Sequence, residues 1–226
     1  MAELTVPERV LKDAARLLEM EKWTQSPVFR RRADDLYLRL RGAVRGRGRM
    51  TQLPFKIAGE TLDFSAFQIK SKDLSRIFAH CQSCVFMSVT LGPEVDRLLA
   101  RVQKEDMADA VLLDALASSE VELMCDRSEQ SVAEKLKDGQ YMTMRYSPGY
   151  GDVPLEVSAY ILSLLGVRGD TGISMTDSFM LVPVKSVTAM IGISDRPELR
   201  ARSCADCYAA ENCVYRKRGA FCGVQN

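Results

Sequence analysis

The chain has 226 residues, of which 46% are hydrophobic, and its 31 Lys and Arg against 30 Asp and Glu give a formal net charge of +1. This length and apolar content suffice for one sizeable domain or two small ones, and they exclude a wholly disordered or fibrous chain. The near-zero charge gives no support for a nucleic-acid partner or an anionic membrane surface. No apolar run reaches the roughly 20 residues that span a bilayer, and residues 1–20 lack the apolar stretch of a secretory signal. We therefore expect a cytoplasmic protein.

The first fifty residues are expected to be mainly helical. Residues 7–20 place apolar side chains at helical spacing and predict an amphipathic helix. The segment 30–49 then holds eight arginines. One interpretation is a solvated helix on which Leu36, Leu38 and Leu40 pack inward, followed by a Gly/Arg loop. The other is a docking surface for an acidic partner or a phosphate group.

The middle of the chain alternates between strand and helix patterns. In order, these predict strands at 53–58 and 61–69 around a turn at Gly59, a helix at 71–84 and a buried strand at 85–91. Ser71 is the predicted N-cap of that helix, and Asp73 lies near the positive end of its dipole.

The second half begins with a long helical pattern. In order, we expect helical structure at 93–137, a short strand at 141–146, a helix at 155–165 ended by Gly166, and a strand, a Pro-containing bend and a second strand within 175–194. Because helices and strands mix without a regular βαβ repeat, the fold class is α+β and not a doubly wound sheet. We divide the chain into an N-terminal helical, Arg-rich segment (1–50), an α+β domain (51–198) and a Cys-rich tail (199–226).

Common catalytic motifs are missing from the sequence. There is no G-x-G-x-x-G, Walker A, G-x-S-x-G or H-E-x-x-H pattern. The single histidine, His80, argues against hydrolase triads and His-rich zinc sites. It is predicted to lie on a helix next to Cys81, where we expect a structural role, since a ligand set of His80, Cys81 and Cys84 would need a fourth donor. These two cysteines and Cys125 are expected to be buried packing residues.

The segment 145–152, RYSPGYGD, is predicted to be an irregular turn. Gly149 and Gly151 permit positive φ angles and let another group approach the backbone closely. Tyr146 and Tyr150 offer flat faces for a heterocycle, and Arg145 has a planar fork suited to a carboxylate. The turn therefore suits a small ligand with both a ring and an acid group, although a structural loop with packing tyrosines stays equally open.

Two motifs resemble a known family. RYSPGYGDVPLE resembles the Arg-x-x-x-Gly-Tyr-x-x-x-Pro turn of the S-adenosylmethionine-binding activation domain of cobalamin-dependent methionine synthase. About 25 residues later, Met175 to Thr188 resembles that domain's Leu-Thr-Glu-Ser-Phe-x-Met-x-Pro-x-x-Ser-Val-Ser segment. The resemblance covers roughly residues 85–195 and implies a twisted, mainly antiparallel sheet flanked by helices.

The resemblance also implies a ligand site. Arg145 would pair with the methionyl carboxylate of S-adenosylmethionine, and Ser147, Gly149 and Tyr150 would belong to the turn around the nucleoside. The family places an acidic residue on a preceding helix, for which Glu122 is the choice here. Glu120 is the alternative, because the helix register is uncertain by one turn.

Two departures from the family pattern affect the implied site. The aromatic pair that follows the Ser-Val-Ser segment in the family is Met190-Ile191 here, which leaves only backbone contacts for the adenine. For the family's Asp on an early strand or helix, no counterpart is identified in this sequence.

The implied function is reductive methylation of cobalamin, which requires partners. No cobalamin-binding signature is present, so the corrinoid would arrive on a partner corrinoid protein or on the cobalamin-binding modules of a methionine synthase, with a flavodoxin-like electron donor. The sulfonium is already activated and cob(I)alamin is a strong nucleophile, so the chain would contribute positioning and exclusion of water. The resemblance leaves open whether this methyltransferase-associated module is itself an enzyme.

Four of the seven cysteines lie in the last 23 residues, which the resemblance does not cover. Cys204, Cys207, Cys213 and Cys222 stand among basic residues, which lower thiol pKa values and offset the charge of thiolates. Such a set suits an iron–sulfur cluster or Zn²⁺, although its spacing matches neither a ferredoxin nor a common zinc ribbon. The alternative is a tail of free or oxidised thiols.

Two other functions are therefore weighed against S-adenosylmethionine binding. One is a reductive activator of corrinoid proteins whose tail carries an iron–sulfur cluster. The other is a non-catalytic interaction domain of the same fold that has lost the ligand.

Overall fold

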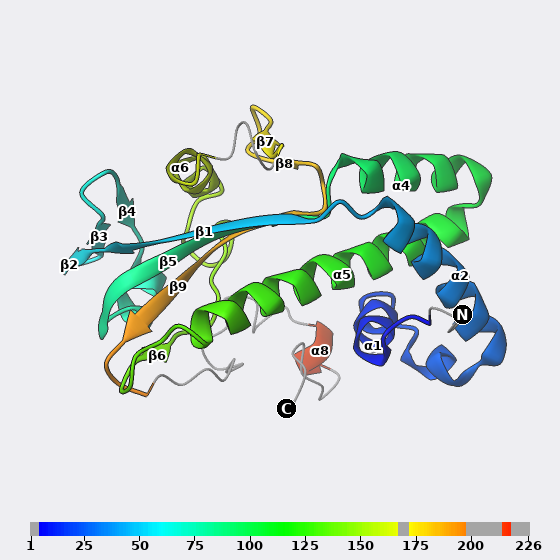
Figure 1. The fold of residues 1–226 in the computed structure, drawn as a ribbon, viewed down its shortest axis with the longest axis horizontal. Coiled ribbons are helices and arrows are strands. Elements are labelled where there is room, and N and C mark those ends of the chain that lie inside the picture. Colours follow the sequence, from blue (N-terminus) through cyan, green and yellow to red (C-terminus); the bar gives the residue numbers. More distant parts are fainter. Residues whose placement is uncertain (1–4, 167–171, 198–213, 218–226) are drawn as a thin grey trace. The chain divides into compact units, whose positions relative to one another are not determined.

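The computed structural model describes residues 5–166, 172–197 and 214–217 (Figure 1). Its helices are α1 (Glu8–Leu17), the 3-10 helix η1 (Glu21–Gln25), α2 (Pro27–Ala43), α3 (Lys72–Ile77), α4 (Pro93–Glu105), α5 (Met107–Ala133), α6 (Val157–Leu164) and α8 (Val214–Lys217). Its strands are β1 (Arg47–Pro54), β2 (Lys56–Ala58), β3 (Thr61–Asp63), β4 (Gln68–Lys70), β5 (Cys81–Thr90), β6 (Tyr141–Met142), β7 (Ser174–Met175), β8 (Leu181–Val182) and β9 (Ser186–Ser194).

The strands form three sheets. The largest has the order β1-β5-β9-β6, and the smaller ones are β2-β3-β4 and β7-β8. The pairs β2–β3, β3–β4, β6–β9 and β7–β8 are all antiparallel. In the pair β6–β9, Tyr141 lies opposite Ser194 and Met142 lies opposite Ile193. The mixture of helices and antiparallel strands confirms the predicted α+β class.

The chain forms two compact units, each assembled from three segments. The first unit comprises residues 1–51, 86–135 and 158–189, and the second comprises 52–85, 136–157 and 190–226. The boundary falls inside β1, β5 and β9, so each of these strands contributes residues to both units. The division of the chain at residues 50 and 198 stays a prediction.

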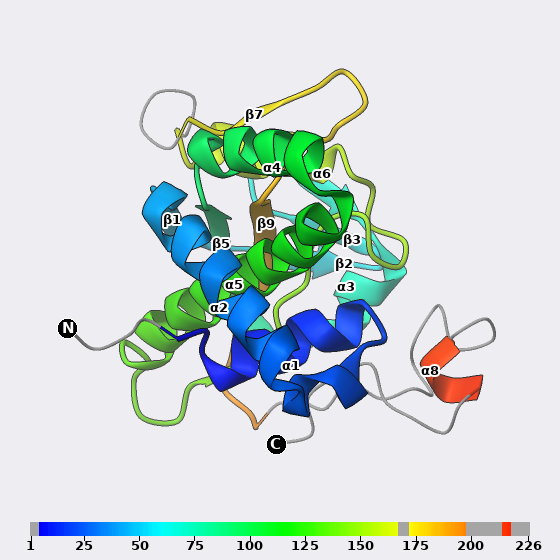
Figure 2. The same cartoon turned by 90° about the vertical axis from the view of Figure 1, so that its right-hand side faces the viewer.

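In the first unit, α5 is the central helix. Helices α1, α2 and α4 pack on it (Figure 2). The Asp106 side chain accepts a hydrogen bond from the backbone N–H of Asp109 at 2.9 Å and so caps the start of α5. Asp106 itself is extended, with φ −154° and ψ 119°. The helical stretch expected from 93 to 137 is therefore two helices that meet at this residue.

A buried carboxylate lies inside this helical packing. The Glu120 side chain is fully buried in the middle of α5. Its Oε2 accepts a hydrogen bond from the Tyr37 hydroxyl at 2.8 Å, and its Oε1 accepts one from Arg41 Nη1 at 2.7 Å. Burial and this hydrogen bond raise the pKa of Tyr37. Both partners lie on α2, so one charged group joins α2 to α5.

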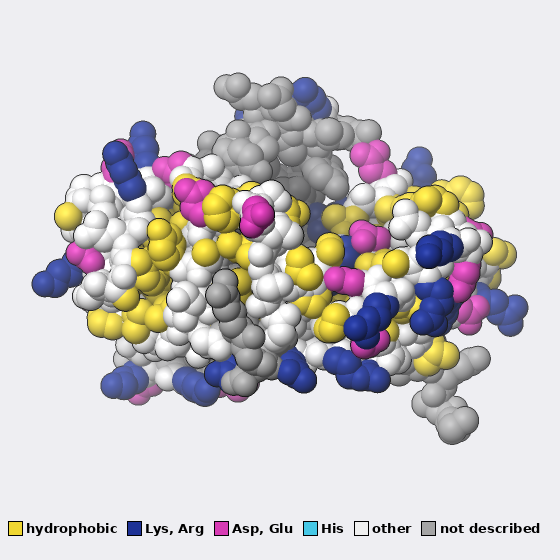
Figure 3. Space-filling model, turned by 90° about the horizontal axis from the view of Figure 1, so that it is seen from above, with side chains coloured by type: hydrophobic (Ala, Val, Ile, Leu, Met, Phe, Trp, Pro, Cys, Tyr) yellow, Lys and Arg dark blue, Asp and Glu magenta, His cyan; other side chains and the backbone are white. Residues whose placement is uncertain are grey.

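The arginines of α2 are largely paired with acidic residues. Arg30 contacts Glu8, Arg32 contacts Asp106 and Asp109, and Arg39 contacts Glu105. On the face of the molecule in Figure 3, basic and acidic side chains lie interspersed, as the net charge of +1 leads one to expect. The first interpretation of the Arg-rich segment, a solvated helix face, therefore holds for most of α2.

Two details of the Arg-rich segment were predicted wrongly. Leu36 and Leu40 are buried, but Leu38 is 56% exposed, because residues four apart share a helix face and the residue midway between them does not. The expected Gly/Arg loop is partly the beginning of β1. A Cβ atom on Gly48 would lie 3.3 Å from the backbone oxygen of Ser88, so glycine lets the backbone approach β5 there.

The second unit holds the three short strands β2, β3 and β4 and the helix α3, which contacts β3. Ser71 caps α3 as predicted, since its Oγ accepts a hydrogen bond from the backbone N–H of Leu74 at 3.0 Å. The helix ends at Ile77, however, and not near residue 84. His80 therefore lies exposed in a turn and not on a helix, and Cys81 begins β5.

The Glu120 contacts yield a first prediction. We expect Tyr37→Phe to lower the free energy of unfolding by about 1–3 kcal/mol, because it leaves one oxygen of a buried carboxylate without its hydrogen bond. Urea denaturation measures this loss. Tyr141→Phe, which removes the same hydroxyl from an exposed side chain, serves as the matched control. Equal stability of the two variants would contradict the prediction.

Candidate functional site

The turn formed by residues 145–152 lies in the second unit between β6 and α6. Its first half is attached to β9. The backbone N–H of Tyr146 donates to the Met190 oxygen at 2.9 Å, and the N–H of Met190 donates to the Tyr146 oxygen at 2.8 Å. This reciprocal pair fixes the backbone directly after Arg145.

The turn closes on itself through backbone hydrogen bonds. The N–H of Gly149 donates to the Val153 oxygen at 2.8 Å, and the N–H of Val153 donates to the Tyr150 oxygen at 3.1 Å. Gly149 has a φ of +90°, and a Cβ atom there would lie 2.6 Å from Leu155 Cδ2. The positive φ favours glycine at this position, and a side chain there would also require Leu155 to move.

Asp152 joins the end of the turn to the start of α3. Its carboxylate accepts hydrogen bonds from the Ser71 hydroxyl, from the backbone N–H of Lys72 at 2.6 Å and from that of Asp73 at 3.4 Å. Burial opposes ionisation of Asp152, but these hydrogen bonds outweigh it and lower the pKa of its carboxyl. The two ends of this contact are 81 residues apart, and no sequence signal connects them.

A second contact joins the turn to α3. The Tyr146 hydroxyl donates to Asp73 Oδ2 at 3.3 Å. Burial and the negative charge of Asp73 raise the pKa of Tyr146, so this hydroxyl keeps its proton. Gly151, with a φ of +54°, lies so close to both side chains that a Cβ atom would collide with them. The Tyr146 hydroxyl thus joins the turn to α3, and its side chain is half-buried.

The predicted ligand residues of the turn share this scaffold. Arg145 and Ser147 are half-buried, Gly149 is exposed, and the Tyr150 side chain is 57% exposed. Met190 and Ile191, which occupy the positions of the family's aromatic pair, are fully buried in β9 and offer no stacking face.

The acidic candidates lie on α5 in the first unit. Glu122 is exposed, whereas Glu120 is buried and bound to Tyr37 and Arg41. Both oxygens of Glu120 are therefore already engaged, one by the Tyr37 hydroxyl and one by Arg41.

The metal candidates Cys204, Cys207, Cys213 and Cys222 lie outside the described residues. Within the described part of the chain, no three His, Cys, Asp or Glu side chains gather closely enough to hold a metal ion. Cys84 and Cys125 are buried, as expected, and burial raises the pKa of the Cys84 thiol, while Cys81 is half-buried. Among the same described residues, no helix is long and apolar enough to cross a membrane.

Comparison with known proteins agrees with the motifs around Arg145. The sequence profile for the activation domain of vitamin B12-dependent methionine synthase matches residues 79–200, which is more than half of the chain. A solved structure, the crystal structure of the MetH reactivation domain bound to AdoHcy, is similar with a TM-score of 0.59 and 19% sequence identity. That match covers 95% of this chain and 77% of the other, and it shows a shared fold. No curated protein matches the chain.

The Asp152 contact predicts a pH dependence. Since the pKa of this carboxyl is lower in the folded state than in the unfolded state, its stabilising contribution is present above about pH 4 and is lost as the pH falls through the folded pKa. We expect Asp152→Asn to be less stable than the wild type at pH 7. The difference should shrink on acidification, as measured by thermal unfolding across pH. A constant difference between pH 7 and pH 3 would contradict this assignment.

Proposed function

The chain belongs to the family of the vitamin B12-dependent methionine synthase activation domain, and on this premise we propose that it binds S-adenosylmethionine and supports reductive methylation of a cobalamin carried by a partner protein. The observation that carries the proposal is the turn 145–152, which presents Arg145 and Tyr150 from a backbone held at both ends. A site held in place before the ligand arrives loses less entropy on binding.

The chemistry of the turn matches both charges of this ligand. The fork of Arg145 suits the methionyl carboxylate. Asp73 and Asp152 place negative charge beside the same turn, where it favours the cationic sulfonium and amino groups. The exposed ring of Tyr150 can cover one face of the nucleoside, which compensates for the buried Met190-Ile191 pair.

Glu122 is proposed as the acidic ligand residue from α5. It is exposed, and its carboxylate is not part of the buried ion pair that holds Glu120. A carboxylate in such a position would bind the amino group of the methionyl part.

The reaction itself requires little acid–base chemistry from this chain. The sulfonium carries an activated methyl group and the cobalamin of a partner supplies the nucleophile, so the chain's residues bind, orient and exclude water. The expected partners are a corrinoid protein or the cobalamin-binding modules of a methionine synthase, with a flavodoxin-like electron donor. The motif residues supply no general base, which is consistent with this division of labour.

Titration calorimetry of the full chain with S-adenosylmethionine tests the proposal. We expect saturable binding by the wild type and at least about tenfold weaker binding by Arg145→Ala, because a charge-assisted hydrogen bond to the carboxylate is lost. Arg31→Ala removes an exposed arginine from α2 and should bind as the wild type does. Arg145→Lys should be intermediate, because it retains the charge but not the fork.

Two results of this titration would refute the proposal. One is absence of binding by a folded wild type, which favours the non-catalytic interaction domain. The other is equal affinity of Arg145→Ala and wild type, which would assign any binding to another site.

We further propose that the tail cysteines Cys204, Cys207, Cys213 and Cys222 bind a metal, in the first instance an iron–sulfur cluster. Four thiols within 19 residues, surrounded by arginine and lysine, support this chemistry. An iron–sulfur cluster would supply an electron for cobalamin reduction.

Anaerobic reconstitution distinguishes the alternatives for the tail. Iron–sulfur absorption that disappears in Cys204→Ser and Cys207→Ser is the expected outcome. The matched control is Cys125→Ser, a buried cysteine of α5 that should leave the absorption unchanged. A colourless protein with stoichiometric zinc would refute the redox role, and a protein without metal would refute both.

A further inference from the structure

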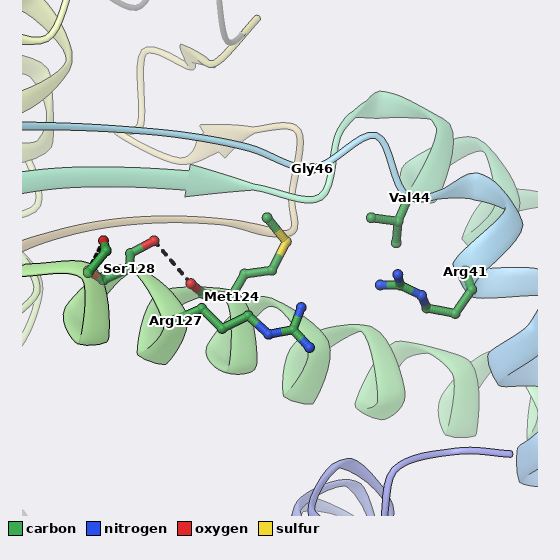
Figure 4. Close-up of a pocket in the computed structure, with 7 residues that line it drawn as sticks. Arg41, Val44, Gly46, Met124, Arg127 and Ser128 are labelled. Atoms are coloured by element: carbon green, nitrogen blue, oxygen red, sulfur yellow. Dashed lines mark hydrogen bonds between the residues drawn. The ribbon is translucent and has the colours of Figure 1, made fainter. Parts of the chain in front are cut away.

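A pocket of about 370 Å³ lies in the first unit (Figure 4). It opens between the C-terminal half of α5 and the segment that leads from α2 into β1. Its wall contains Arg41, Val44, Met124, Arg127, Ser128 and Ser131. The residues of the turn at 145–152 do not line it.

One of the two cations of this pocket, Arg41, is held by the buried carboxylate of Glu120. Arg41 donates through Nη1 to Glu120 Oε1 at 2.7 Å, and Glu120 is fully buried and also bound by the Tyr37 hydroxyl. The Arg41 side chain is itself 40% exposed. Arg41 is therefore oriented by a buried group while its other nitrogens face the pocket, which is how a binding arginine is pre-organised.

The second cation, Arg127, has no carboxylate partner in the part of the chain that the structure describes. Its neighbours three and four positions away on α5 are Leu123, Met124, Gln130 and Ser131, none of which is acidic. Within the described ranges, its guanidinium makes no hydrogen bond or ion pair. In Figure 4 the guanidinium groups of Arg41 and Arg127 point toward one another across the space below Val44 and Met124. Two like charges in this position favour an anion between them.

The rest of the lining is neutral. Val44 and Met124 supply apolar surface. The Ser128 hydroxyl donates to the Met124 oxygen at 3.0 Å, and the Ser131 hydroxyl donates to the Ser128 oxygen at 2.8 Å. Among the residues that the structure describes, no carboxylate lines the pocket, and Glu120, which contacts Arg41, is already bound by it. The described residues thus leave the pocket with a net positive charge.

We propose that this pocket binds the phosphate group of a small phosphomonoester. Arg127 offers a complete fork and Arg41 the part of its fork that Glu120 leaves open, and a phosphate dianion has three oxygens and two charges to meet them. A volume of about 370 Å³ exceeds that of phosphate alone and leaves room for an organic group against Val44 and Met124. This inference concerns a ligand other than S-adenosylmethionine, which contains no phosphate.

The test is a titration of the full-length chain with inorganic phosphate, phenyl phosphate and acetate at constant ionic strength. Binding is measured from the shift of the Arg127 Nε–H signal in NMR spectra. We expect saturable binding of phosphate, tighter binding of phenyl phosphate and weaker binding of acetate. Arg127→Ala should weaken phosphate binding about tenfold or more, because one charge-assisted contact is lost. Since this variant lacks the Arg127 signal, its phosphate binding is measured by calorimetry. Ser131→Asp, which places a carboxylate in the pocket, should abolish it.

The controls separate this site from the one proposed at Arg145. Arg31→Ala and Arg145→Ala should both leave phosphate binding unchanged, and S-adenosylmethionine should not displace phosphate. Thermal unfolding checks that each variant is folded. The proposal is overturned by any of these results: no saturable phosphate binding by the wild type, equal affinity for acetate, equal weakening by Arg31→Ala, or displacement by S-adenosylmethionine.

Discussion

The candidate ligand turn depends on the hydrogen bonds between the Asp152 carboxylate and the start of α3. Helix α3 has only six residues, and a helix of this length is not stable by itself in water. Its first N–H groups have no acceptors within the helix, and Asp152 supplies one for Lys72 and Asp73. In return, the helix start fixes the end of the turn. The turn and the helix are therefore each incomplete without the other, and Arg145 is presented from a backbone that both of them hold.

The parts of this site that the sequence predicted are those set by local rules. Ser71 is an N-cap because its own hydroxyl reaches a backbone N–H three residues later. Gly149 and Gly151 permit positive φ angles, and both residues adopt them. The two motifs, one around Arg145 and one from Met175 to Thr188, were sufficient to predict the family. In each case the information lies within a few consecutive residues.

What the sequence did not predict depends on contacts between distant segments. The bond from Ser71 to Asp152 could not be read from either segment alone. The helix expected up to residue 84 ends at Ile77, because the residues from Cys81 onward form strand β5. Hydrogen bonding to neighbouring strands there stabilises the strand more than the local sequence pattern favours a helix. Likewise, the sequence did not predict that Glu120 is buried and Glu122 exposed, since both stand on the same helix two residues apart.

The arginines of the first unit show how charge is distributed in a nearly neutral chain. Most of those on α2 are paired with acidic side chains at the surface, where such pairs contribute little to stability. Arg41 is different, because its partner is buried and a buried charge without a partner is costly. The same pairing orients Arg41 toward the pocket that it shares with Arg127. A single contact can therefore serve both packing and the placement of a binding group.

The contact between Asp152 and α3 also has a consequence for motion. Opening of the turn removes the acceptor of the Lys72 amide, and fraying of α3 removes the donors that hold Asp152. The amide protons of Lys72, Asp73, Gly149 and Val153 should then exchange with solvent in the same opening event. The turn and the short helix thus constitute one cooperative unit, which a ligand bound to the turn would protect from exchange as a whole.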